Sequence, residues 1–170
     1  MNMKMLAKFF ALSGAAMALG ATPGIGAGGV HCHDVGGSVL TNFLDPSQCL
    51  PTTGSSVGLC TDGPATGDLR GAVGVQVLKA TTNVLHNHHH WVTESGDTIT
   101  FEDADLTLLA NVNGQSLFNY LQGVTITGGT GGFEGASGNL NSVFGAVDLN
   151  KGQVTLRYAG TVCFPTVKEP

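Results

Sequence analysis

The sequence contains few charged residues. Asp, Glu, Lys and Arg account for 11% of its 170 residues, and only 7 are Lys or Arg, whereas charged residues average about 25% of a soluble domain. Binding to a nucleic-acid backbone needs clustered Lys and Arg, which this chain has too few of, so we expect no nucleic-acid partner. Apolar residues still make up 42%, which is more than a disordered acidic chain carries. The length then predicts one folded domain.

Long apolar runs are also scarce, and the one present lies at the N-terminus. It covers residues 6–21, begins among Lys4 and Lys8, and contains the small-residue site Ala18-Leu19-Gly20. A basic start, an apolar middle and small residues in this order predict a secretory signal peptide, to which we assign residues 1–28. No other run approaches the ~20 apolar residues of a membrane span. We therefore expect a secreted or periplasmic mature chain without a membrane span.

Cysteine is scarce and even in number. The chain has no C-x-x-C pair, which disfavours redox catalysis and a zinc ribbon. In an exported chain, the four cysteines Cys32, Cys49, Cys60 and Cys163 predict two structural disulfides. Three pairings are open. One of them joins Cys60 to Cys163, tying the first predicted strand to the last, and leaves Cys32 with Cys49.

Helical periodicity is absent as well. Gly accounts for 26 residues, which dilutes every candidate helix, and runs rich in Thr and Val alternate with Gly, Asn and Asp turns. This pattern predicts an antiparallel sandwich or a closed barrel. Residues 29–56, rich in Gly, Ser, Thr and Pro, are expected to form an irregular, disulfide-linked N-terminal arm. The predicted strands are 57–61, 67–79, 83–94, 97–109, 116–127, 136–147 and 153–163.

A glycine-rich turn in residues 121–138, which read LQGVTITGGTGGFEGASG, resembles a known signature. It is similar to the G-G-x-G-x-F-x-G-A-x-G pattern of allene oxide cyclases, shared more loosely by dirigent proteins and by secreted bacterial proteins with the same barrel. The matching residues are Gly128, Gly129, Gly131, Phe133, Gly135, Ala136 and Gly138.

The resemblance has implications for fold and function. It implies an all-β fold, a single antiparallel allene oxide cyclase-like barrel of seven to eight strands over residues 57–163, followed by a tail at 164–170. It implies a cofactor-free apolar cavity that holds an apolar or aromatic small molecule and acts by orienting it. No set of catalytic residues transfers from the family to this chain.

Histidine gathers in one predicted strand, where residues 84–94 read VLHNHHHWVTE. Alternate side chains of a strand point to opposite faces, so the first of the two faces carries His86, His88, His90 and Glu94, and the second carries Leu85, Asn87, His89 and Trp91. The first face could be an exposed polar surface, a cavity wall doing acid–base work, or a metal site. Three histidines on a straight strand span about 13 Å, too far for one zinc ion. We expect no metal to be required for folding.

A few further side chains are candidates for a site. Trp91, Phe144 and Tyr158 are expected to form an aromatic lining for a ligand. Glu134, beside Phe133 in the glycine turn, is expected to reach over the barrel mouth. Glu134, Tyr158 and His88 are the candidate catalytic groups. A change of phase in the acidic strand 97–109 predicts a bulge near Asp103.

Three functions remain open at this point. The first is an exported barrel that binds an apolar or aromatic small molecule and acts as a cyclase or isomerase without a cofactor. The second is a non-catalytic extracytoplasmic carrier or interaction protein, which could be a homo-oligomer. The third is a metal-binding protein that uses the histidine strand. A hollow interior with converging ionisable groups would favour the enzyme, and a packed interior would favour an interaction role.

Overall fold

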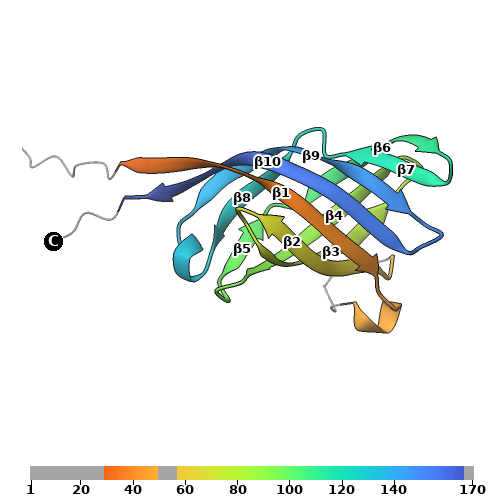
Figure 1. Cartoon of the computed structure of the whole chain (residues 1–170), viewed down its shortest axis with the longest axis horizontal. Coiled ribbons are helices and arrows are strands. Elements are labelled where there is room, and N and C mark those ends of the chain that lie inside the picture. Colours follow the sequence, from red (N-terminus) through yellow and green to blue (C-terminus); the bar gives the residue numbers. More distant parts are fainter. Residues whose placement is uncertain (1–28, 50–56, 167–170) are drawn as a thin grey trace, which may run out of the picture.

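The computed structural model describes residues 29–49 and 57–166, which form a twisted antiparallel barrel (Figure 1). The predicted signal peptide and most of the predicted tail lie outside the described residues. Two short 3-10 helices accompany the sheet, η1 (Pro46–Gln48) and η2 (Gly131–Phe133). The strands are β1 (Val30–Phe43), β2 (Leu59–Gly67), β3 (Gly71–Ala80), β4 (Val84–Thr93), β5 (Thr98–Phe101), β6 (Ala104–Val112), β7 (Gln115–Asn119), β8 (Val124–Gly129), β9 (Ser137–Asp148) and β10 (Gln153–Pro165).

The sheet closes because β10 pairs with β1 on one side and with β9 on the other. β5 and β6 share the position next to β4, and β7 and β8 share the position next to β9. Ten strands therefore fill eight positions around the barrel. The predicted antiparallel barrel is confirmed.

The barrel begins earlier than its predicted start at residue 57. Val30–Phe43, expected to be irregular, is β1 and runs beside β10 from Val30 opposite Pro165 to Asn42 opposite Gln153. Gly37 is a glycine for packing reasons, since a Cβ there would lie 1.9 Å from the carbonyl oxygen of Thr66. Glycine within a strand can thus mark close backbone approach rather than a loop, which is why this segment was expected to be irregular.

Two predicted strands are each divided in two. The segment 97–109 breaks at Glu102 and Asp103, where the bulge was expected, so β5 and β6 pair with different parts of β4. The segment 116–127 breaks at residues 120–123, so β7 and β8 pair with different parts of β9. Both breaks let one position of the barrel be shared by two short strands.

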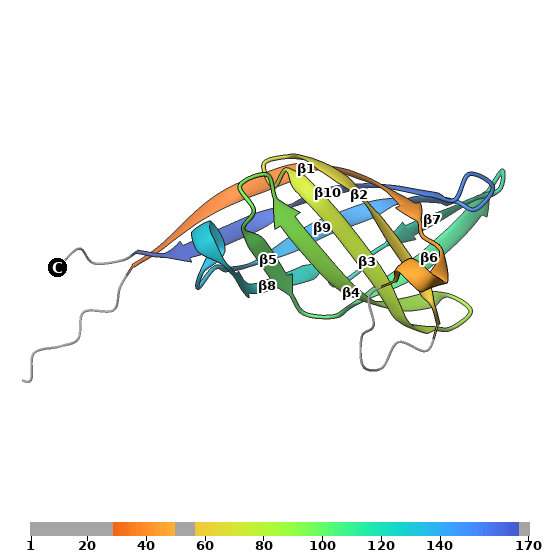
Figure 2. The ribbon, with the colours of Figure 1, turned by 90° about the horizontal axis from the view of Figure 1, so that it is seen from below.

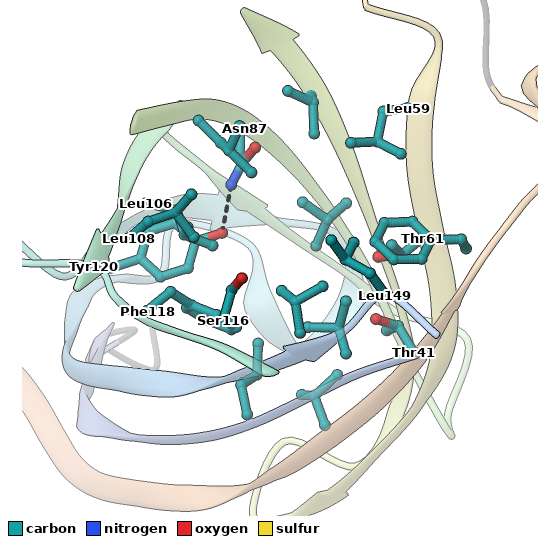
Figure 3. A pocket seen from close by; sticks show the side chains of 18 residues that line it. Thr41, Leu59, Thr61, Asn87, Leu106, Leu108, Ser116, Phe118, Tyr120 and Leu149 are labelled. Carbon is teal, nitrogen blue, oxygen red and sulfur yellow. Dashed lines mark hydrogen bonds between the residues drawn. The ribbon is translucent and has the colours of Figure 1, made fainter. Parts of the chain in front are cut away.

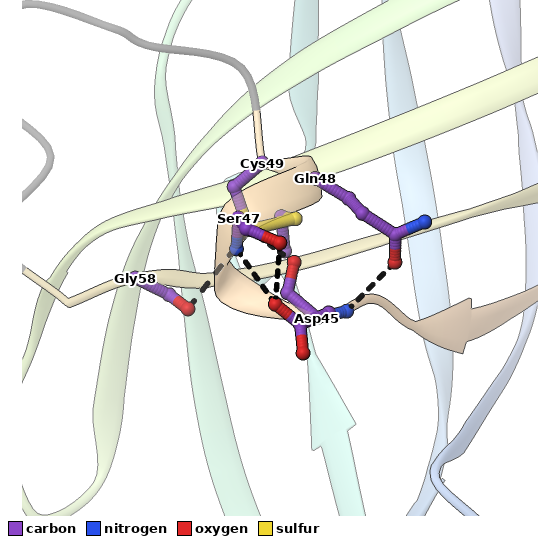
Figure 4. The surroundings of a disulfide bond; sticks show 6 residues. Asp45, Ser47, Gln48, Cys49 and Gly58 are labelled. Atoms are coloured by element: carbon purple, nitrogen blue, oxygen red, sulfur yellow. Dashed lines mark hydrogen bonds between the residues drawn. A yellow bond between two sulfur atoms is a disulfide. The ribbon is translucent and has the colours of Figure 1, made fainter.

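Both predicted disulfides are present, but their pairing differs from the one named above. Cys32 is bonded to Cys163, and Cys49 is bonded to Cys60. The register of β1 explains this, because it places Cys32 directly opposite Cys163 on β10. The second bond joins the segment after η1 to β2 (Figure 4).

The two ends of the barrel differ (Figures 1 and 2). At one end, which we call the η2 end, the β1/β10 ribbon projects beyond the barrel and η2 folds against it, with the rings of Phe133 and Phe164 5.6 Å apart. At the other end, the η1 end, lie η1 and the turns between β3 and β4, β6 and β7, and β9 and β10. Within the described residues, no helix is long and apolar enough to cross a membrane.

Candidate functional site

The η1 half of the barrel interior is hollow (Figure 3). A cavity of about 160 Å³ lies there, and engineered apolar cavities of about 150 Å³ bind benzene. Inward-facing side chains form its wall because alternate residues of each strand point inside. The lining residues are Val39, Thr41, Phe43, Leu59, Thr61, Val75, Val77, Leu85, Asn87, Leu106, Leu108, Ser116, Phe118, Tyr120, Val147, Leu149, Val154 and Leu156.

Among the described residues, none with a charged side chain lines this cavity. Its wall is mostly aliphatic, and Leu149, in the turn after β9, is 66% exposed, so the lining reaches the surface at the η1 end. An ionic ligand would lose its hydration here without gaining a counter-charge, whereas an apolar ligand gains from leaving water. The wall therefore favours uncharged, apolar molecules about the size of one aromatic ring.

Two polar side chains on one side of the cavity wall, Asn87 and Tyr120, bond to each other, and Tyr120 also contacts His89, which lies outside the lining. Tyr120, which follows β7, is 2% exposed, and its Oη accepts a hydrogen bond of 2.8 Å from Asn87 Nδ2 on β4. His89 Nε2, also on β4, lies 2.9 Å from the same Oη. Asn87 and His89 share the inward face of β4, as predicted for the second face of residues 84–94. We call these three residues the Asn87–Tyr120–His89 cluster.

Burial controls the protonation of this cluster. Desolvation lowers the pKa of His89 to about 4, with a smaller effect from neighbouring His88. Desolvation raises the pKa of Tyr120, opposed by its hydrogen bond from Asn87. At neutral pH both side chains are therefore uncharged, and the cluster offers hydrogen bonds rather than ions to a ligand.

The η2 half of the interior is filled. Trp91 is 5% exposed and its Nε1 donates to the carbonyl oxygen of Leu69, while Tyr158, 3% exposed, packs edge-on against it with ring centroids 5.3 Å apart. The remaining void is about 30 Å³, room for about two water molecules. Trp91 and Tyr158 face inward as expected, but they fill the barrel core outside the 160 Å³ cavity.

The predicted catalytic groups do not converge. The Tyr158 hydroxyl donates to the Thr66 carbonyl and accepts from the Leu69 amide, so its bonds are used by the backbone. Glu134 is exposed in the turn after η2, and it does not line the cavity. Phe144 requires a correction: it is 51% exposed on the outside of β9, because its neighbour Val143 takes the inward position.

The first face of the histidine strand points outward. His88 Nδ1 lies 2.6 Å from Asp103 Oδ1, and His86 Nδ1 lies 2.8 Å from Asp105 Oδ1. His86 Nε2 also lies 3.9 Å from Asp103 Oδ2, so both imidazoles contact Asp103. Glu94 lies beyond the end of β4. Across the described residues, no group of three or more His, Cys, Asp or Glu side chains is placed to hold a metal ion. His88 is therefore separated from the cavity by the sheet.

Sequence reasoning missed Tyr120 and Asn87 as site residues. Asn87 was placed on the correct face, but nothing distinguished that face as the inner one. Tyr120 fell inside a predicted continuous strand, and its inward position depends on the turn at residues 120–123. The usable signal was Gly123, whose positive φ of 72° belongs to the turn that follows Tyr120.

Comparison with known proteins gives little beyond this geometry. No protein family model matches the sequence, and no curated protein matches it. Among solved structures, that of the pterocarpan synthase dirigent protein aligns with 83% of this chain and 89% of its own length, at 12% identity and a TM-score of 0.35. A TM-score this low does not establish a shared fold, so the barrel is assigned from its own strand pairing.

Proposed function

We propose that this protein is an exported barrel that binds an apolar or aromatic small molecule in the cavity at the η1 end. The observation that carries the proposal is a cavity with an uncharged wall in one half of an otherwise packed barrel. Protein interiors are normally close-packed, and an empty aliphatic cavity weakens the fold in proportion to its volume. A ligand that fills the cavity offsets that loss and gains the hydrophobic free energy of its own burial.

Export is part of the proposal and rests on two features. The basic and apolar N-terminal segment has the order of a signal peptide, and both disulfides require an oxidising compartment such as the periplasm or the cell exterior. A cavity protein in that compartment meets its ligand outside the cytoplasm.

Binding without catalysis is the function that the wall supports best. General acid–base chemistry in the cavity would have to use Tyr120, because no carboxylate, amine or imidazole of the described residues lines it. Holding a ligand needs only the shape and the apolar surface. Cyclisation or isomerisation by orientation alone would use the same cavity, so the first experiment measures binding.

The test is thermal unfolding with and without ethylbenzene. Ligand at ten times its dissociation constant adds about 1.4 kcal/mol to the free energy of unfolding, which raises Tm by about 4 °C in a domain of this size. Ser116→Phe fills the cavity and should abolish the shift. Ser142→Phe, the same change on the exposed face of β9, should keep it. An unshifted Tm in the unsubstituted protein, or equal shifts in both variants, would refute the proposal.

A further inference from the structure

We infer that the natural ligand carries a hydroxyl group, which binds between Asn87 and Tyr120 while its apolar body fills the cavity. The inference rests on the proposed function and names the class of ligand: an uncharged phenol or alcohol of about one ring. The hydroxyl would donate a hydrogen bond to Asn87 Oδ1 and accept one from the Tyr120 hydroxyl.

The first observation is an unused acceptor. Asn87 is 1% exposed and lines the cavity, and no donor among the described residues reaches its Oδ1. Nearly all buried polar atoms in proteins have a hydrogen-bond partner, and leaving one unpaired costs about 1–3 kcal/mol. Oδ1 belongs to the same amide as Nδ2, which lies 2.8 Å from Tyr120 Oη. Oδ1 has almost no surface open to the cavity, so a ligand group beside that bond reaches both residues by displacing the wall side chains around it.

The second point is that one tautomer of His89 leaves the Tyr120 O–H able to donate a hydrogen bond to a ligand. A neutral His89 carries one N–H. When that hydrogen is on Nε2, it donates to Tyr120 Oη, 2.9 Å away, and Asn87 Nδ2 donates to the same oxygen. The Tyr120 O–H is then free to donate to a ligand oxygen. His89 thus positions the hydroxyl of Tyr120 and does not itself touch the ligand.

These two bonds define which groups the cluster prefers. A hydroxyl satisfies both the open acceptor and the open donor. An ether or ketone satisfies only the donor, and a hydrocarbon satisfies neither. A carboxylate is disfavoured because the lining contributed by residues 29–49 and 57–166 holds no cationic side chain. Sites built to hydrogen-bond a hydroxyl reject analogues that lack it, because their own polar atoms are left unpaired.

The experiment is calorimetric titration of the full mature chain with para-cresol, anisole and para-xylene. These three molecules have the same number of non-hydrogen atoms and differ in what they can donate and accept. We expect para-cresol to bind at least about 10-fold more tightly than para-xylene, with anisole between them, since one net hydrogen bond is worth about 1 kcal/mol or more.

Three variants test whether the preference for para-cresol depends on Asn87 and Tyr120. Asn87→Leu should bring para-cresol to within about 3-fold of anisole, and Tyr120→Phe should bring anisole to within about 3-fold of para-xylene. Thr41→Val removes a different hydroxyl from the cavity wall and should leave the preference intact.

The outcomes separate the two proposals. Equal affinity for all three molecules, or tightest binding of anisole, overturns the hydroxyl inference and leaves the cavity as a binding site. Loss of the preference in Thr41→Val rather than in Asn87→Leu overturns the assignment to Asn87 and Tyr120. Failure of all three to bind overturns both proposals. The comparison within the unsubstituted protein does not depend on whether Asn87→Leu folds.

Discussion

The two halves of the barrel interior are built from the same strands and serve different ends. Around Trp91 and Tyr158, in the η2 half, side chains fill the space and bond to the backbone, leaving a void of about 30 Å³. In the η1 half, aliphatic side chains and small hydroxyls leave about 160 Å³. The difference arises from side-chain size at inward positions of shared strands. The packed half stabilises the fold, and the open half is the one to which we assign the proposed ligand.

Each half also has its own disulfide, and removing one of them gives the largest expected loss of stability. The Cys32–Cys163 bond closes a loop with a sequence separation of 131 at the η2 end, and Cys49–Cys60 one of 11 at the η1 end. The cost of a lost disulfide rises with loop length. We expect replacing Cys32 and Cys163 by Ser to cost about 5 kcal/mol, and replacing Cys49 and Cys60 about 3 kcal/mol. Urea unfolding measures both, and equal costs would contradict the contrast.

Truncating one side chain in each half gives the next largest difference. Trp91→Ala empties a packed region and should cost about 3–5 kcal/mol. Leu108→Ala enlarges a cavity that already exists around a half-buried residue, and we expect about 1–2 kcal/mol. Chemical denaturation of both variants beside the unsubstituted protein supplies the comparison. A larger cost at Leu108 than at Trp91 would mean that the η1 half is the packed one.

Acid should lower the free energy of unfolding through His89, which lies between the two halves of the interior. Its pKa is lowered to about 4 by burial, so the unfolded chain binds more protons than the folded one between about pH 6.5 and pH 4. Stability that is present at neutral pH is therefore lost as the pH falls through this range, by up to about 3 kcal/mol. His89→Gln keeps a hydrogen-bonding group and should remove that part of the slope. Unfolding measured at several pH values would contradict the account if both proteins showed the same slope.

The smallest contrast concerns hydroxyl groups. Tyr158→Phe leaves the Leu69 amide without its 3.0 Å bond, and an unpaired buried donor costs about 1–3 kcal/mol. Ser116→Ala removes a hydroxyl from the cavity wall and should change stability by less than about 0.5 kcal/mol. Thermal unfolding distinguishes these values, and a greater loss at Ser116 would argue against an open η1 half.

Much of the barrel could be predicted from sequence, because turn residues and alternation mark strands locally. The residues of β4 were assigned to the correct two faces, and both disulfides were expected. β1 was missed because Gly37 lies where Thr66 and Tyr158 approach closely, a requirement visible only after the barrel closes. The pairing of Cys32 with Cys163 depends on that strand, so it was missed for the same reason.

The site was less predictable because it depends on what faces across the barrel. Trp91, Phe144 and Tyr158 were chosen as large aromatic residues, yet two of them fill the core and Phe144 lies outside. The hollow is defined by Val, Leu, Ser and Thr side chains, which look like ordinary strand residues in the sequence. Tyr120 enters the site through a turn that divides one predicted strand into β7 and β8.

The measurement that tests the central claim most directly is methyl NMR under xenon pressure. Xenon enters dry apolar cavities, so it reports where the interior is hollow. We predict xenon-dependent shifts for the methyl groups of Val77, Leu85 and Leu106, which line the η1 cavity, and none for Val73, Val124 and Val143, which surround the small void. Shifts confined to the second set, or no shifts at all, would contradict a ligand-sized cavity in the η1 half.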